Sequence, residues 1–266
     1  MSFDIGRLRD TNMSSSSLPI HNNLLQQLSR QQRTRIIDAC EPVELHFGDS
    51  LCAAGHPFVH VYFPLNAFIS LVAGVSRHPP LEIGMIGSEG MLGSTLVLGV
   101  KTSPLQAIVQ RTGSALRMPV KRFFTALLDN SELRPVLGRY QYVLLRQMSQ
   151  TAACTRFHEL GTRLVRWLLM TNDRANADTF YLTHQFLADM LGVQRSAVTI
   201  AAGALQRQGL IRYTRGEITI LDRHGLEAMA CECYRVIVDD YQQTFASHCT
   251  TRLTAASAHR LASDFS

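Results

Sequence analysis

A glycine at position 192 constrains the fold of this chain more than any other residue, because it separates two short stretches with helical periodicity. The first stretch begins at about Thr183, and the second covers about residues 195–208. Glycine adopts left-handed backbone angles without steric cost, so it can end one helix and turn the chain sharply into the next. Ala188 is small enough for a second helix to cross closely. The pattern predicts two helices joined by a tight turn.

Apolar and polar residues around this turn divide between two sides. Five apolar positions can pack the two helices together: Leu187, Leu191, Val193, Val198 and Ala201. The polar side chains fall outside: His184, Gln185, Asp189, Gln194, Arg195, Ser196 and Thr199. An ordinary helical hairpin does not fix so many offsets at once. The pattern is typical of the DNA-binding helix-turn-helix.

The residues after the second helix extend this motif. Gly209 ends the helix, and residues 210–213 and 218–221 alternate as two strands around a turn at 214–217. Two such strands make a wing, so the unit is predicted to be a winged helix-turn-helix.

In a winged helix-turn-helix, the first residues of the second helix meet base edges in the major groove. The candidate base-reading residues are Gln194, Arg195, Ser196 and Thr199. Arg195 is the main candidate, because a guanidinium can bond O6 and N7 of guanine together. The candidate phosphate contacts are Thr183 and Gln185 in the first helix, and Arg212 and Arg215 on the wing.

The first half of the chain has a different texture, with short apolar runs separated by glycine and proline. The runs cover residues 43–47, 59–63, 68–72, 81–86, 107–109 and 115–118. Such spacing predicts an antiparallel barrel or sandwich. Helices are expected between residues 24 and 40, and residues 1–18 are expected to form a flexible leader outside any core.

A long helix is predicted to begin at about Ser131, which can serve as its cap. Its heptad seam consists of Leu133, Leu137, Tyr140, Leu144, Gln147, Thr151 and Cys154, at alternating steps of four and three. Such a seam can pair with a second copy of the chain. Periodicity equally fits an ordinary core helix packed within its own domain.

Composition agrees with a phosphate-rich partner. Only two of the 26 basic residues are lysines, and the formal net charge is +5. Arginine suits bidentate contacts with phosphate and bases. The six cysteines show no disulfide framework, and no apolar stretch is long enough to span a membrane, so a cytoplasmic protein without membrane contact is expected.

Sequence motifs of enzymes are absent: there is no GxSxG, HExxH, GxxxxGK[ST] or paired CxxC. Cys231 and Cys233, with His224 nearby, could form a redox pair or a partial metal site. Two thiols beside an acidic C-terminal helix are the favoured interpretation, because no second ligand pair is visible in the sequence. We therefore expect no enzyme, no metal and no cofactor.

The order of these segments resembles the Crp/Fnr transcription regulators over roughly residues 20–225. The resemblance is carried by FGDSLCAAGHPFVHVYFPLNAFISLV, IGSEGMLGSTLVLG, ALRMPVKRFFTALL and LTHQFLADMLGVQRSAVTIAAGALQRQGLI. It implies an α+β fold with a cyclic-nucleotide-binding-like antiparallel β-roll as sensor domain. The implied boundaries are 19–130 for the β-roll, 131–155 for a dimerisation helix, 156–225 for the winged helix-turn-helix and 226–266 for a helical tail.

Several positions depart from the family pattern. Cyclic-nucleotide binders carry a glutamate and an arginine in a phosphate cassette. Here Ser94 follows Gly93 in the glutamate position, and the arginine position falls at residues 102–104, which include Ser103. Cyclic AMP is therefore not expected as the ligand, although Lys101 or Arg111 could partly replace the missing charge.

The sequence also departs from the family in the residues that bind other cofactors and in those that contact DNA. Cys40 and Cys52 are too few for a four-cysteine iron–sulfur cluster in the first half of the chain. A haem remains open, and its candidate ligands are His46, His56, His60 and His78. The family arginine matches Arg195, but Ser196 and Ile200 replace a glutamate and a later arginine, so the preferred DNA sequence should differ from that of the best-known members.

The resemblance implies a bacterial, sequence-specific DNA-binding transcription regulator. Its expected partners are double-stranded DNA on a two-fold related site, a second copy of the chain and RNA polymerase. An effector other than cyclic AMP at the β-roll is left open. The alternative is a ligand-sensing module that regulates a partner protein without binding DNA, and such a module would not need an intact helix-turn-helix.

Overall fold

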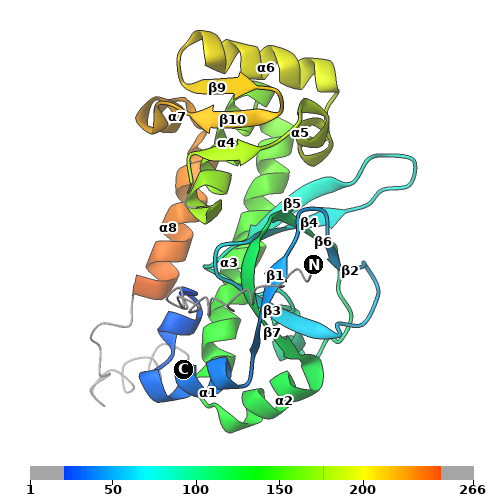
Figure 1. The fold of residues 1–266 in the computed structure, drawn as a ribbon, viewed down its shortest axis with the longest axis vertical. Helices are drawn as coiled ribbons and strands as arrows, with labels where there is room; N and C mark the ends of the chain where they lie inside the picture. The colour runs from blue at the N-terminus through cyan, green and yellow to red at the C-terminus, as the bar shows by residue number, and fades with distance from the viewer. Residues whose placement is uncertain (1–20, 176, 247–266) are drawn as a thin grey trace, which may run out of the picture.

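The computed structural model describes residues 21–175 and 177–246 of the chain. It confirms the predicted α+β architecture: an antiparallel β-roll, a long helix and a C-terminal winged helix-turn-helix follow one another (Figure 1). The predicted leader, residues 1–18, lies outside the described residues. In the part of the chain that is described, no helix combines the length and apolarity required to cross a bilayer.

The β-roll consists of two antiparallel sheets. One has the order β1 (Glu41–Leu45), β7 (Gly113–Pro119) and β3 (His60–Pro64), and the other has the order β2 (Ser50–Cys52), β6 (Gln106–Arg111), β4 (Phe68–Ala73) and β5 (Leu81–Ile86). Each of the six predicted apolar runs overlaps one strand and contains at least half of its residues. The sequence analysis missed β2, because this three-residue edge strand is not buried and has no apolar run.

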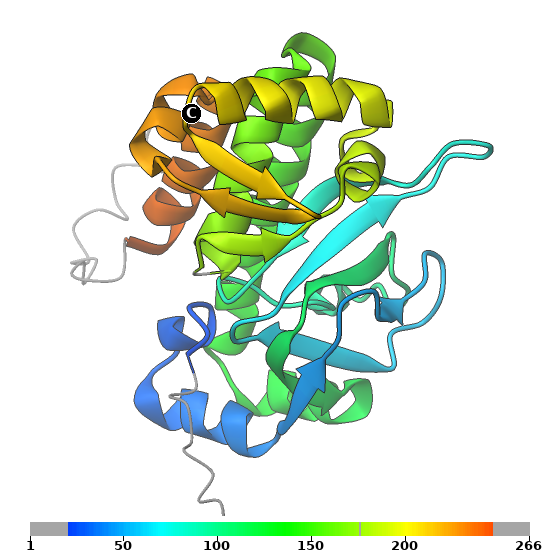
Figure 2. The same ribbon diagram turned by 45° about the horizontal axis from the view of Figure 1, so that its top comes forward.

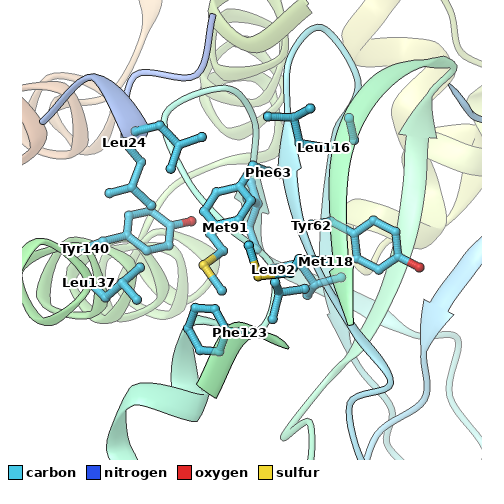
Figure 3. Close-up of a cluster of buried hydrophobic side chains, with 14 of the residues drawn as sticks. Leu24, Tyr62, Phe63, Met91, Leu92, Leu116, Met118, Phe123, Leu137 and Tyr140 are labelled. Carbon is cyan, nitrogen blue, oxygen red and sulfur yellow. The ribbon is translucent and has the colours of Figure 1, made fainter. Parts of the chain in front are cut away.

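Short helices close the β-roll. They are η1 (Leu25–Gln27), α1 (Arg30–Asp38), η2 (Ser94–Leu98) and α2 (Val120–Asp129). Figure 3 shows that the core of the roll brings together Leu24, Phe63, Met91 and Phe123 with side chains of the long helix. The long helix is therefore part of the core of the roll.

The long helix α3 spans Leu133–Phe157 rather than 131–155. Ser131 does not cap it, because Asn130 accepts hydrogen bonds from the backbone N–H groups of Glu132 and Leu133, each at 3.0 Å. The predicted heptad seam is entirely buried against this chain's own strands and helices. The structure therefore favours the core-helix interpretation of this seam.

The polar members of the seam find partners within the same chain. Gln147 accepts a hydrogen bond from the backbone N–H of Met85 at 2.6 Å and donates one to the carbonyl of Met85 at 3.3 Å. Thr151 accepts one from Arg166 at 3.1 Å. These two residues fix how α3 lies against β5 and α4 (Leu160–Ala175), and they do not face a second helix of another chain.

The sheet that contains β4 and β5 is covered on both faces. Phe68 and Met85 pack into a second core with α4, while Ile69 and Ile86 point into the roll. Five of the six residues of β4 are buried, which explains why its sequence is a continuous apolar run instead of an alternating one. The C-terminal half is therefore seated directly on the roll.

Within residues 160–175 and 177–246, the structure contains a small three-stranded sheet and five helices, of which α4 is the first. The remaining elements are β8 (Thr179–Tyr181), α5 (His184–Leu191), α6 (Arg195–Arg207), β9 (Ile211–Thr214), β10 (Glu217–Ile220), α7 (Arg223–Met229) and α8 (Glu232–Ala246). Helix α8 runs beside α3 in both views (Figures 1 and 2), and Arg146 and Asp240 join the two helices through an ion pair at 2.9 Å. The described part of the predicted tail is thus helical and is packed against the long helix.

Candidate DNA-binding interface

The turn of the helix-turn-helix forms as its sequence predicts. Gly192 has φ 65° and ψ 42°, in the left-handed region, at the C-terminal end of α5. The next residue, Val193, donates its N–H to the carbonyl of Ala188 at 2.9 Å, which is the 6→1 bond of a Schellman motif. A Cβ atom at Gly192 would lie 2.8 Å from Cδ1 of Leu81 in the β-roll. The left-handed backbone angle therefore favours glycine here, and a side chain would also force Leu81 to shift.

Helix α6 has one buried and one exposed face. Val198, Ala202 and Leu205 are at most 2% exposed and pack on α4 and α5. The opposite face carries the exposed residues Arg195, Ser196, Thr199, Ile200 and Arg207. In Figure 1, α6 lies along the outer end of the molecule, and no described element is drawn beyond it. The exposed face is therefore free to enter a groove.

The N-terminal end of α6 presents the predicted base-reading residues together. Gln194 is the N-cap residue and Arg195 begins the helix, with Ser196 next to it, and all three are exposed. No side chain caps this end. The first N–H groups of the helix and the guanidinium of Arg195 thus form one electropositive end.

The fourth predicted base-reading residue, Thr199, is held in place by two contacts. Its hydroxyl lies 2.9 Å from Nδ1 of His184 and donates to the carbonyl of Arg195 at 3.1 Å. The ring of His184 stacks on Tyr213 of the wing, with 4.1 Å between ring centroids. Burial and the nearby positive charge of Arg195 lower the pKa of His184, so the ring is neutral at pH 7. The sequence analysis missed this bridge between the two helices and the wing.

The predicted phosphate contacts lie at two separate edges of α6. Thr183 is the N-cap of α5 and accepts a hydrogen bond from Phe186 N–H at 3.1 Å, which leaves its own hydroxyl proton available. Gln185 is exposed and donates to Asp189 at 2.9 Å.

On the wing, Arg212 and Arg215 are both exposed. Arg215 and Gly216 form the two-residue turn between β9 and β10, with φ values of 52° and 89°. Two positive φ angles are typical of a type I′ hairpin turn, which projects the side chain of Arg215 from the tip. Strand β8 pairs with β10 and widens the wing into three strands, a strand that the sequence analysis did not predict.

The sensor cassette is closed in this structure. Ser94 is buried and accepts a hydrogen bond from Gln141 of α3, and Ser103 donates to the carbonyl of Leu105 at 2.6 Å. The cavity beside these serines has a volume of about 40 Å³, and its lining residues are all uncharged. Binding sites for small molecules usually measure about 300–1,000 Å³, so a nucleotide has neither space nor a cationic partner here.

The two basic residues suggested as substitutes do not reach this cavity. Arg111 donates to the backbone carbonyls of Asn66 and Ala175, and so it joins the roll to the end of α4. Lys101 is exposed. The suggestion for Arg111 is therefore wrong, because its guanidinium is already used between domains.

A larger cavity, of about 380 Å³, lies between α3, α4 and α8. Its lining includes the hydroxyl-bearing residues Tyr140 and Tyr241 and an ion pair between Arg174 and Glu89 at 2.8 Å. The sequence contained no local signal for this cavity, since its walls come from six segments spread from residue 23 to residue 242.

The structure also shows where the four histidines considered as haem ligands lie. His46, His56 and His78 are exposed, and His60 is half-buried with its ring centroid 6.2 Å from that of Tyr62. Surface positions of this kind give a haem no apolar enclosure. His224 is exposed and faces Glu227, so it does not join Cys231 and Cys233, and the redox or metal alternative that included His224 is not supported.

Comparisons with known proteins agree with this geometry. The family model for the Crp-like helix-turn-helix domain matches residues 162–229. The global nitrogen regulator of Nostoc sp. (strain PCC 7120) is 24% identical over 176 residues, which cover 62% of this chain and 78% of that protein.

Solved structures show the same fold over most of the chain. FixK2 from Bradyrhizobium japonicum has a TM-score of 0.61 at 15% identity and covers 72% of this chain and 98% of that one. The c-di-GMP responsive global regulator CLP of Xanthomonas campestris has a TM-score of 0.58 at 16% identity and covers 73% of this chain and 100% of that one. Residues 162–229 therefore match the Crp-like helix-turn-helix domain, and the chain as a whole shares the fold of these solved structures.

Proposed function

We propose that this chain is a Crp/Fnr-type transcription regulator, a homodimer that reads a two-fold related DNA site with helix α6. The observation that carries the proposal is the exposed N-terminal end of α6, where Gln194, Arg195, Ser196 and Thr199 lie on one uncovered face. The opposite face of the same helix is buried and makes its core contacts, which leaves this face accessible to a partner.

Direct base reading is assigned first to Arg195. Its guanidinium is exposed on the first turn of α6, where a helix in the major groove meets base edges. We add Ile200 to the reading face, because its side chain is 71% exposed one turn further along α6. An apolar side chain at this place can contact the methyl group of thymine. Arginine and isoleucine would then read different bases of one half-site.

Contacts with the sugar–phosphate backbone are assigned to Thr183, Gln185, Arg212 and Arg215. These residues flank α6 on the α5 side and on the wing. Residues 182–221 contain four basic and two acidic residues, a small excess for a polyanion. Doubling the unit in a dimer doubles that charge, and phosphate contacts add affinity without reading sequence.

The dimer interface is assigned to the outer stripe of α3. The stripe consists of Pro135, Gly138, Tyr142, Leu145, Ser149, Ala152 and Arg156, at alternating steps of three and four, and every member is exposed. Leu145 is 62% exposed and Tyr142 is 52% exposed, on a helix whose other side forms the core. A second copy of the chain fits this heptad stripe, because two α3 helices can pack along it knobs into holes.

Such a dimer places two α6 helices in successive major grooves, about 34–36 Å apart. Regulation by cyclic AMP is not part of the proposal, since the cassette cavity is small and uncharged. RNA polymerase is the expected partner of a DNA-bound regulator of this family, and activation and repression are both compatible with the proposal.

The test is a selection of bound fragments from sheared genomic DNA, followed by fluorescence anisotropy on the enriched sequence. We expect a palindromic consensus and affinity that falls steeply with salt. Arg195→Ala should relax the preference for one base pair in each half-site by about 1–3 kcal/mol, whereas Arg235→Ala, an exposed arginine on α8, should leave it unchanged. Absence of DNA binding at low salt would instead favour the ligand-sensing module.

A further inference from the structure

Four side chains of metal-binding type converge where the long helix ends. Cys154 lies in the last turn of α3 and His158 directly follows that helix, while Cys231 directly precedes α8 and Cys233 lies in its first turn. Their ligand atoms all lie within 4.8 Å of one another. The Sγ atoms of Cys154 and Cys231 are 3.7 Å apart, and Sγ of Cys233 is 3.4 Å from Nδ1 of His158.

These distances fit a single ion at the centre of the four atoms. Zinc binds thiolate sulfur at about 2.3 Å and imidazole nitrogen at about 2.0–2.1 Å, so two sulfurs on a tetrahedral zinc are about 3.8 Å apart. The observed sulfur–sulfur separation of 3.7 Å matches that spacing. It is far longer than the bond of about 2.05 Å in a disulfide.

The surroundings of the four residues complete a zinc-type site. Nε2 of His158 lies 3.3 Å from a carboxylate oxygen of Glu232, so the ring can donate to Glu232 while Nδ1 faces the sulfurs. Metal-bound histidines usually have such a partner, which fixes the tautomer. Gln150 donates to Sγ of Cys233 at 3.0 Å. The three cysteines are buried and the histidine is half-buried, which excludes bulk water from the centre.

Positive charge is also close to the thiols. The guanidinium of Arg166 donates a hydrogen bond at 3.1 Å to Thr151, which lies three residues before Cys154 on α3. Arg166 is itself buried in α4. Three thiolates and one neutral histidine leave a zinc site with one net negative charge, which this guanidinium can balance.

We propose that Cys154, His158, Cys231 and Cys233 form a Cys₃His site for Zn²⁺. Cysteine and histidine ligands with no carboxylate in the set favour zinc over magnesium, calcium or manganese. The two ligand pairs have compact spacings, C-x₃-H on one helical turn and C-x-C at a helix start, as in structural zinc sites.

The proposed zinc site would connect two parts of the chain because of where it lies. Cys154 and Cys231 are 77 positions apart, and the segment between the two ligand pairs contains the whole winged helix-turn-helix. Helix α4 begins at Leu160, directly after His158. A bound ion therefore ties the exit of the DNA-binding unit to its entrance and holds α8 against α3.

The first experiment measures metal in the full-length protein. Protein purified under reducing conditions is stripped with a chelator, reloaded with Zn²⁺ alone and analysed by plasma mass spectrometry. We expect one zinc per chain for the wild type and for Cys40→Ser, a half-buried cysteine outside the cluster, and a loss of at least tenfold in Cys233→Ser and His158→Ala. Equal zinc content in the wild type and in both cluster variants would overturn the proposal.

A second measurement does not depend on how the variants fold. Wild-type protein with and without Zn²⁺ is treated with an alkylating reagent, and modified cysteines are mapped by mass spectrometry. Zinc should protect Cys154, Cys231 and Cys233 together and leave the reactivity of Cys40 and Cys52 unchanged. Failure of Zn²⁺ to protect the three thiols, or a Cys154–Cys231 disulfide that persists in the reduced protein, would contradict the site.

Discussion

Glu82 in β5 accepts a hydrogen bond at 2.8 Å from the indole nitrogen of Trp167 in α4. The same carboxyl group contacts the hydroxyl of Ser70, so it joins the β-roll to the DNA-binding half inside a buried layer. Burial raises the pKa of Glu82 to about 7, against the opposing effects of these two hydrogen bonds and of the charges on Arg166 and Arg174. The domain junction therefore contains an acid that titrates near neutral pH.

The pKa of Glu82 predicts how stability changes with pH. The folded protein holds a proton that the unfolded chain releases at about pH 4.5, so the free energy of unfolding should fall as pH rises from about 4.5 to about 7. Over this pH range, the titration of Glu82 should lower the free energy of unfolding by about 3 kcal/mol in total. Glu82→Gln should remove this part of the pH dependence, measured by denaturant unfolding at several pH values, while Glu159→Gln, at an exposed position, should keep it. An unchanged slope in Glu82→Gln would show that other groups cause the dependence.

Replacement of Gly192 should weaken the helix-turn-helix. Gly192→Ala combines a positive φ of 65° with a Cβ 2.8 Å from Leu81, so we expect a loss of stability of about 1–2 kcal/mol in thermal unfolding. Gly161→Ala is the matched control, because that helical glycine has ordinary φ and open space around it. The control should be neutral or stabilised by up to about 1 kcal/mol. Equal effects of the two substitutions would contradict the strain argument.

Removal of a wing arginine should change affinity but not sequence preference. Arg215→Ala removes a positive charge from the tip of the turn between β9 and β10. If this side chain contacts a phosphate, the slope of log affinity against log salt should decrease by about 1 per binding site. Base preference, measured on a panel of single-base variants of the site, should stay as in the wild type. A change in preference at one position would make Arg215 a base-reading residue.

A charge in the outer stripe of α3 should separate the dimer. Leu145→Arg places a guanidinium at a position that is 62% exposed in the single chain and buried in the proposed interface. Sedimentation velocity should then show a monomer with reduced DNA affinity. Leu128→Arg introduces the same charge on α2, where the leucine is 81% exposed, and should sediment as the wild type does. A dimeric Leu145→Arg protein would place the interface elsewhere.

Local chemistry explains which parts of the fold were predictable. Gly192 and the Arg215–Gly216 turn act through backbone angles within a few residues, so the helix-turn-helix and the wing could be predicted from the sequence. Arg195 was assigned by its offset from that glycine, and its exposed position agrees with the assignment, while its role in DNA binding stays a prediction.

Features that depend on contacts between distant segments of the chain could not be predicted from the sequence. The periodicity of α3 predicts an apolar stripe at Leu137 and Leu144 but not whether the covering surface is another chain or the same one. His158 and Cys233 are 75 positions apart, so neither residue predicts the other. The bond between His184 and Thr199 likewise depends on how α5 crosses α6, which no local pattern specifies.

The sheet formed by β4 and β5 has a consequence for how this protein can be divided. Phe68 and Met85 point away from the roll into the core around α4. A fragment that ends after α3 would therefore expose an apolar surface on the roll. Such a fragment would also leave Glu82 without the indole of Trp167. The two halves of this chain thus share a buried boundary, and mutations there should lower the yield of folded protein because they expose apolar surface.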